Sequence, residues 1–104
     1  MKAIRRNGGY SIETANNYVN ENQNIYNLST QLEVRRKWQD NHPTDEISGY
    51  MAWFSQEGLE PFQVKFESKV KLPDYLAKVN FDNLEACEVR NNVYFRATAL
   101  KEVK

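Results

Sequence analysis

Apolar and polar residues alternate with a period of two, in short runs, from residue 28 to the end of the chain. This period is typical of half-buried β-strands, and short turn sequences between the runs favour antiparallel hairpins. A parallel sheet needs crossover helices, and no long helical pattern follows residue 27. We therefore expect five antiparallel strands, which the pattern places at residues 28–38, 47–55, 62–66 with an extension to 72, 79–90 and 93–100.

Turn residues separate these predicted strands. Residues 40–45 are a dense turn sequence, residues 56–61 form the next loop, and Asn91-Asn92 suits a type I′ hairpin because asparagine tolerates a positive φ. Residues 73–76 break the third strand, and Asp82-Asn83 bulges or interrupts the fourth. Five short, twisted strands connected in this way predict a mainly β fold, namely a five-stranded antiparallel OB-like barrel or a closely related sandwich.

Asparagine is concentrated near the N-terminus, where seven of the 12 asparagines lie between residues 7 and 27. Because asparagine favours turns over regular structure, we expect residues 1–27 to form a polar, weakly ordered arm and residues 28–104 to form the β-barrel domain. The arm is expected to hold one short helix, with Ser11 as its N-cap. Its apolar face comprises Ile12, Ala15, Tyr18 and Val19. The arm either lies on the domain or orders on a partner, and the first alternative is favoured because short polar arms are common at termini.

Length and charge exclude several classes of protein. The 104 residues are enough for one domain and too few for two. Fourteen basic residues balance 14 acidic ones, so any site for a polyanion must be a local patch rather than a histone-like charged surface. No apolar run approaches the roughly 20 residues that span a bilayer, and residues 1–10 lack the apolar core of a signal peptide. A cytoplasmic protein without membrane contact is expected.

The sequence offers little chemistry for catalysis or metal binding. Cys87 and His42 are the single cysteine and the single histidine, too few for an internal disulfide or a structural zinc site. We expect Cys87 to be a small core residue and His42 to be a solvated turn residue. The acidic pairs are expected on solvated faces: Asp45-Glu46, Glu57 with Glu60, and Glu85 with Glu88. We therefore expect no enzymatic activity, no catalytic residues, no cofactor and no metal site.

Aromatic and basic residues interleave along the predicted strands. An unpaired nucleic-acid strand needs positive charge along its phosphates and flat rings for its bases, and a twisted sheet can present both. The candidate nucleic-acid-binding residues are Arg35, Arg36, Lys37, Trp38, Tyr50, Trp53, Lys65, Tyr94 and Arg96. The phenylalanines expected in the core instead are Phe62, Phe66, Phe81 and Phe95. Two alternatives stay open: Trp38 and Trp53 also fit a core or a dimer interface, and residues 35–37 also fit a soluble strand end.

The second half of the chain contains a characteristic order of short segments. They are Pro61-Phe62-Gln63-Val64-Lys65-Phe66, Pro73-Asp74-Tyr75, Val79-Asn80-Phe81, Asn92-Val93-Tyr94-Phe95-Arg96-Ala97 and Leu100-Lys101-Glu102-Val103-Lys104. In this order of strands, proline-tyrosine turn and basic-apolar tail, residues 47–104 resemble the small single-stranded DNA-binding proteins of filamentous phages. That family, the gene V type, has counterparts on Gram-positive plasmids and conjugative elements.

The resemblance implies a five-stranded OB-like barrel and a homodimer that coats single-stranded DNA with little sequence preference, in rolling-circle replication or conjugative transfer. By position, it implies phosphate contact or base stacking by Arg35, Lys37, Tyr50, Lys65, Tyr94 and Arg96. We therefore expect a single-stranded DNA-binding protein of a plasmid, phage or conjugative element. The alternative is a small phage or plasmid accessory protein that binds and modulates a host protein through exposed aromatic residues.

Overall fold

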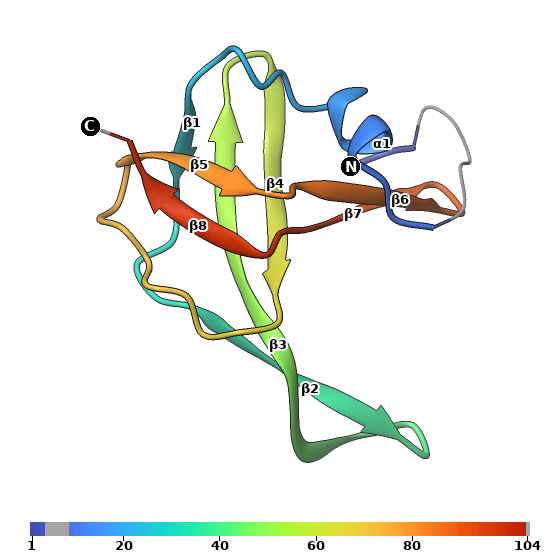
Figure 1. Ribbon diagram of the computed structural model, residues 1–104. Helices are drawn as coiled ribbons and strands as arrows, with labels where there is room; N and C mark the ends of the chain where they lie inside the picture. Colours follow the sequence, from blue (N-terminus) through green and yellow to red (C-terminus); the bar gives the residue numbers. More distant parts are fainter. Residues whose placement is uncertain (4–8, 104) are drawn as a thin grey trace.

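The chain has a mainly β fold in the computed structural model, which describes residues 1–3 and 9–103 (Figure 1). A short helix, α1 (Ile12–Asn16), precedes the strands. The strands are β1 (Ile25–Asn27), β2 (Glu33–Gln39), β3 (His42–Gln56), β4 (Leu59–Phe66), β5 (Lys78–Asp82), β6 (Glu85–Val89), β7 (Asn92–Arg96) and β8 (Ala99–Glu102). The mainly β class predicted from the sequence is confirmed. Residues 4–8 of the predicted arm and residue 104 of the predicted domain lie outside the described residues.

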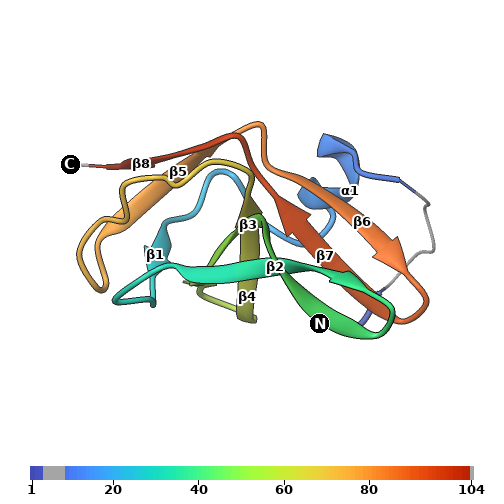
Figure 2. The ribbon, with the colours of Figure 1, turned by 90° about the horizontal axis from the view of Figure 1, so that it is seen from below.

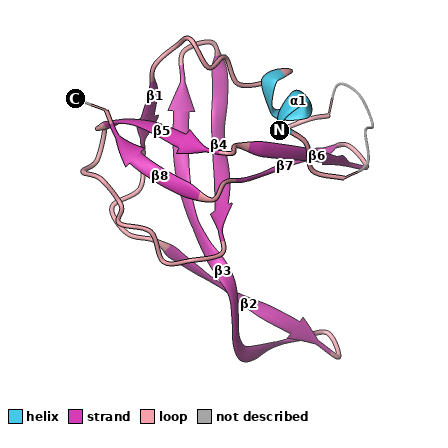
Figure 3. Cartoon of the chain, in the orientation of Figure 1, coloured by secondary structure: helices cyan, strands magenta, loops and turns pink. Residues whose placement is uncertain are grey.

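Within the described residues the strands form one open sheet of eight strands rather than a closed barrel of five (Figure 3). Their order is β6-β7-β4-β3-β1-β5-β8, and β2 lies off this path and pairs with β3. The prediction of a purely antiparallel sheet is wrong, because β4 and β7 are parallel, with Val64 opposite Phe95. The crossover between them is made by β5 and β6 instead of by a helix, so the missing helical pattern could not exclude a parallel pair.

The strand β2 and the first half of β3 form a two-stranded ribbon that projects from the rest of the sheet (Figures 1 and 2). The sequence predicted a half-buried strand over residues 28–38, but every residue of β2 is exposed. The ribbon extends beyond the core, so both of its faces meet solvent. Its turn is also shorter than the predicted one at residues 40–45. Asp40 and Asn41 form it with φ values of 52° and 64°, the type I′ geometry that matches the twist of paired strands.

The predicted strand over residues 79–90 is two strands, β5 and β6, separated at Asn83, whose φ is 55°. The chain changes neighbours at this point, since β5 pairs with β1 and β8 whereas β6 pairs with β7. The β6–β7 turn consists of Arg90 and Asn91, one residue earlier than predicted. The predicted extension of the third strand to residue 72 is a loop.

Phenylalanine rings from β3, β4 and β7 form the centre of the core. The expected burial of Phe62, Phe66 and Phe95 is confirmed. Phe81 is half-buried and packs edge-on against Phe54, with 4.8 Å between the ring centres. The buried apolar residues are Ala15, Val19, Ile25, Ala52, Phe54, Phe62, Val64, Phe66, Val79, Ala86, Val93, Phe95 and Ala97. All strand members of this set from β3, β4 and β7 alternate with side chains on the opposite face of the sheet.

Residues 9–27 contribute to this same core. The helix α1 begins after Ser11, whose Oγ accepts a hydrogen bond from the Thr14 backbone N–H at 3.1 Å, as predicted for an N-cap. Ala15 and Val19 are buried, and Ile25 is buried in β1, which pairs with both β3 and β5. A segment predicted to be a polar arm therefore supplies both a strand and apolar side chains to the domain.

Two buried amide side chains attach neighbouring turns to the sheet. Asn27 is fully buried, and its Nδ2 donates hydrogen bonds to the backbone oxygens of Pro73 and Asp74 at 2.8 and 3.2 Å. The Gln56 side chain donates to the backbone oxygen of Asn20 at 2.6 Å and accepts from the backbone N–H of Asn20 at 2.9 Å. Because these polar atoms have partners, their burial does not carry the penalty of unsatisfied groups.

The single cysteine and the single histidine have the burial that the sequence predicted, but one acidic residue does not. Cys87 is buried and His42 is exposed. Glu88 was predicted to be solvated with Glu85, yet it is 4% exposed and accepts a hydrogen bond from the Tyr18 hydroxyl. That bond from the N-terminal segment gives the buried carboxylate a partner. In the described part of the chain, no helix has the length and apolar character needed to cross a lipid bilayer.

Candidate functional site

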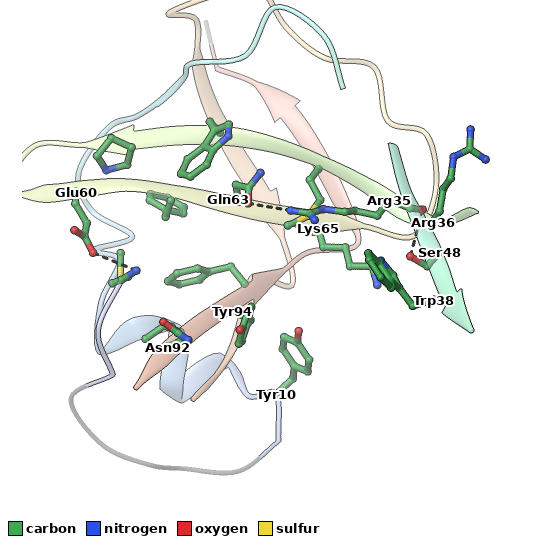
Figure 4. Close-up of a pocket in the computed structure, with 17 residues that line it drawn as sticks. Tyr10, Arg35, Arg36, Trp38, Ser48, Glu60, Gln63, Lys65, Asn92 and Tyr94 are labelled. Atoms are coloured by element: carbon green, nitrogen blue, oxygen red, sulfur yellow. Dashed lines mark hydrogen bonds and ion pairs between the residues drawn. The ribbon is translucent and has the colours of Figure 1, made fainter. Parts of the chain in front are cut away.

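A groove of about 820 Å³ lies on the face of β3, β4 and β7 that points away from the core (Figure 4). Side chains in a strand point alternately to the two faces of a sheet, so the residues between the buried phenylalanines and valines face this groove. The ribbon borders the groove on one side, and N-terminal residues border it on the other. Its aromatic, polar and basic lining includes Tyr10, Arg35, Arg36, Trp38, Met51, Trp53, Gln63, Lys65 and Tyr94.

The floor of the groove is built from neighbouring positions of β2, β3 and β4. Trp53 on β3 lies opposite Gln63 on β4, and Met51 lies opposite Lys65. Directly opposed residues of an antiparallel pair project to the same face. Arg35 on β2 reaches over the same floor toward Gln63 (Figure 4). The register therefore places an aromatic ring, a thioether, an amide and two cations side by side.

Arg35 is held by its neighbours in this floor. Its Nε lies 2.7 Å from the sulfur of Met51, and its Nη2 donates to Oε1 of Gln63 at 3.4 Å. Gln63 is itself oriented, because its Nε2 donates to a carboxylate oxygen of Glu33 at 2.8 Å. A polar chain thus runs across three strands and fixes the direction of the Arg35 guanidinium.

Lys65 lies across β3 because residue 49 is a glycine. A Cβ atom built on Gly49 would lie 2.7 Å from Cε of Lys65 and 2.9 Å from the backbone oxygen of Phe66. Both distances are shorter than real Cβ contacts allow. The missing side chain therefore makes room for the lysine chain on the groove floor, where its ammonium can meet an anionic ligand.

The ribbon supplies the most exposed ring of the groove. Trp38 is 70% exposed, and its cross-strand partner on the ribbon is Pro43. Beside it, Nη1 of Arg36 donates to the backbone oxygen of Asp45 at 3.3 Å, a contact that leaves the charge of the guanidinium uncompensated. The projecting ribbon therefore presents both an exposed ring and a free positive charge.

The opposite wall contains Tyr94, which is 48% exposed, and Tyr10. The guanidinium of Arg96 lies over the Tyr10 ring and pairs with Oε1 of Glu85 at 2.9 Å. Burial, helped by a hydrogen bond shared with Cys87, raises the pKa of Tyr10 to about 12, so its hydroxyl is neutral at ordinary pH. Tyr10 also borders a smaller hollow of about 430 Å³ that contains Arg96, and Lys65 lines both hollows.

The charge of the groove is positive. Its lining carboxylate, Glu60, is paired with the α-amino group of Met1 at 3.4 Å. Among the described residues, Arg35, Arg36 and Lys65 form no ion pair with an acidic side chain. A chain with no net charge therefore presents a local cationic surface, as the sequence required of any polyanion site.

The structure brings together most of the residues predicted for the site. Those lining the groove are Arg35, Arg36, Trp38, Trp53, Lys65 and Tyr94. Lys37 points elsewhere and pairs with Glu46 at 3.3 Å. Tyr50 lies on the opposite face of β3 from Met51 and Trp53. It is one position from Met51 and three from Trp53, and successive side chains of a strand point to opposite faces. Arg96 lies in the smaller hollow.

Tyr10, Met51 and Gln63 also line the groove, although the sequence did not predict them as site residues. Tyr10 was hidden because it lies in the segment interpreted as an arm, far along the chain from the strands that it meets. Gln63 could have been found, since it alternates with the apolar residues of the third predicted strand. Met51 is a neutral, apolar residue, and nothing in its local sequence distinguishes a groove position from a core position.

Within the described residues, no group of three or more histidine, cysteine, aspartate or glutamate side chains is arranged to hold a metal ion. Comparisons of the chain with protein-family models, with curated proteins and with solved structures give no significant match.

Proposed function

We propose that this protein binds single-stranded DNA in the groove on the outer face of β3, β4 and β7. The observation that carries the proposal is the coincidence, in one groove, of exposed rings and cations without acidic partners. Trp38, Trp53 and Tyr94 supply flat surfaces, and Arg35, Arg36 and Lys65 supply charge. Exposing large rings to water is costly for folding, so their concentration around one groove favours a ligand that covers them.

In the proposed mechanism, electrostatic contacts with phosphates and stacking of bases both contribute to binding. Lysine and arginine neutralise phosphates and release counterions, which makes the affinity fall as salt rises. The rings accept unstacked bases, at roughly 1–3 kcal/mol per base. Every base has a flat face, so most of this binding is insensitive to sequence. Duplex DNA keeps its bases stacked inside the helix, so the rings of the groove have less to bind there.

Further parts of the proposal follow from the sequence. We also propose that the curved sheet is related to the OB fold, that the protein is a cytoplasmic homodimer, and that a plasmid, phage or conjugative element encodes it. A homodimer would let one particle hold two strand segments and so gain avidity. Light scattering of the purified protein, alone and with oligonucleotide, measures whether the dimer exists.

A salt titration tests the proposal. Fluorescence anisotropy with labelled oligo-dT of about 12 nucleotides should show binding that weakens steeply between about 50 and 200 mM salt. Lys65→Ala should reduce the logarithmic salt slope by about 0.7, the value for one phosphate contact on a single strand. Lys69→Ala is the matched control, because Lys69 is exposed in the β4–β5 loop and does not line the groove. Equal effects of the two substitutions would contradict a role for the groove.

A second candidate is an accessory protein that binds a host protein. The ribbon favours it, because Val34 and Ile47 are 46% and 47% exposed there beside the more exposed Trp38. An interface driven by such apolar contacts would be insensitive to salt, unlike phosphate binding. If the protein does not bind oligo-dT at any salt concentration, this second function is favoured.

A further inference from the structure

Arg35 has one occupied edge and one open edge. A guanidinium can donate two parallel hydrogen bonds from its Nε–Nη2 edge or from its Nη1–Nη2 edge. The first edge faces the floor of the groove, through Met51 and Gln63. Among the described residues, Nη1 of Arg35 makes no hydrogen bond and the side chain makes no ion pair. The second edge is therefore available to a ligand, in a direction that the floor already fixes.

The Arg35 side chain lies close to a stacking surface. Arg35 reaches Gln63, and Gln63 is the residue directly opposite Trp53 in the β3–β4 register. The Trp53 ring is 43% exposed and lines the same groove. A base that stacks on Trp53 would therefore have its edge on the side of the groove floor that Arg35 and Gln63 occupy.

We propose that Arg35 and Trp53 form a guanine subsite within the groove, a proposal that rests on the single-stranded DNA binding proposed above. Guanine carries two adjacent acceptors, O6 and N7, and an arginine fork bonded to this pair is the commonest specific contact between proteins and DNA bases. Adenine presents a donor beside N7, which opposes the fork; on the corresponding edge thymine presents a single acceptor and cytosine a donor.

A phosphate is the rival occupant of the open edge, since a fork also suits two phosphate oxygens. The position of Arg35 favours the base. It lies on the floor beside the ring, whereas Arg36 and Lys65 offer charge from the ribbon and from β4 without a matching fixed fork at the stacking ring. A base stacked on the floor keeps its phosphate toward the outside of the groove.

The experiment compares oligo-dT of about 12 nucleotides with the same strand carrying a single central dG, dA or 7-deaza-dG. Because the strand can shift its register, the single purine can reach the subsite. We expect dG to bind at least about fivefold more tightly than dA, and 7-deaza-dG, which lacks the N7 acceptor, to lose most of that gain. Equal affinities for dG and dA would overturn the guanine subsite while leaving the DNA-binding proposal intact.

Conservative variants separate the fork from the charge. Arg35→Lys should abolish the preference for dG, because lysine retains the charge and loses the planar fork. Arg90→Lys is the matched control and should keep the preference, because Arg90 is exposed in the β6–β7 turn and does not line the groove. If Arg35→Lys keeps the preference as well, the fork does not read guanine and the proposal fails. Failure of every strand, oligo-dT included, to bind the native protein would instead reject the proposed function and the subsite together.

Discussion

The guanidinium carbon of Arg96 lies 4.0 Å from the centre of the Tyr10 ring. The two residues come from opposite ends of the chain, and neither reaches the other through a regular pair of strands. Their contact lies where the main groove and the smaller hollow adjoin, because Tyr10 lines both. Arg96 is held a second time by Glu85, so its charge is largely occupied in the free protein.

Removing the partner of Arg96 should strengthen DNA binding. Glu85→Gln leaves a side chain of the same shape and frees the guanidinium for a phosphate. The exposed ion pair of Arg96 with Glu85 itself contributes only about 0–1 kcal/mol. We therefore expect an affinity for oligo-dT up to about fivefold higher, and a salt slope steeper by about 0.7 for the added phosphate contact. Anisotropy titrations measure both quantities. Glu57→Gln in the exposed β3–β4 turn is the control. An unchanged slope would show that Arg96 does not contact phosphate.

The Tyr10 hydroxyl should make stability sensitive to alkaline pH. Burial and the contact with Cys87 raise its pKa from 10 to about 12 in the folded state. The neutral form is favoured in the folded protein, so this contribution to stability is complete below about pH 10 and is lost as the pH rises toward 12. Denaturant unfolding across this range should show a shallower loss of stability in Tyr10→Phe than in the native protein. Tyr75→Phe, at an exposed tyrosine, should follow the native curve.

Asn27 should be among the most costly polar positions to truncate. Its side chain donates to the backbone oxygens of Ser29, Pro73 and Asp74 and accepts from the Ser29 backbone N–H at 3.0 Å, all at a fully buried site. We expect Asn27→Ala to lower the free energy of unfolding by about 2–4 kcal/mol, because buried backbone groups lose their partners. Asn24→Ala, at an exposed position of the same segment, should change it by less than about 0.5 kcal/mol. Chemical denaturation measures both free energies of unfolding, and similar losses in the two variants would refute the role assigned to Asn27.

Gly49 should be intolerant of even one added carbon. In Gly49→Ala the new methyl meets Lys65 and the Phe66 backbone oxygen, so we expect a loss of about 1–3 kcal/mol in the free energy of unfolding. DNA binding should also weaken, because the lysine chain leaves the groove floor. In a Lys65→Ala background the same substitution should cost less, since one of the two clashes is gone. A cost that is identical in both backgrounds would mean that Lys65 does not lie over Gly49 in solution.

The composition and alternation of the chain determined several features without any tertiary information. The mainly β class, the N-cap at Ser11 and the burial of Phe62, Phe66, Phe95 and Cys87 were all predicted correctly. These features depend on local chemistry, such as a hydroxyl that can bond a free N–H or an apolar residue at alternate strand positions. Most of the residues predicted for the site also line the groove, because so many rings and cations cannot all enter one core.

Tertiary structure alone decided which strands meet and which faces they share. Alternation states that a residue is on one side of a strand but not which neighbour covers that side, so it could not exclude the parallel β4–β7 pair or show that β2 is exposed on both faces. The grouping of Tyr50 with Trp53 was an error that alternation itself could have prevented, because residues three positions apart on a strand lie on opposite faces. Tyr10 joined the groove only through the packing of the N-terminal segment, a contact between positions distant in sequence that no local pattern encodes.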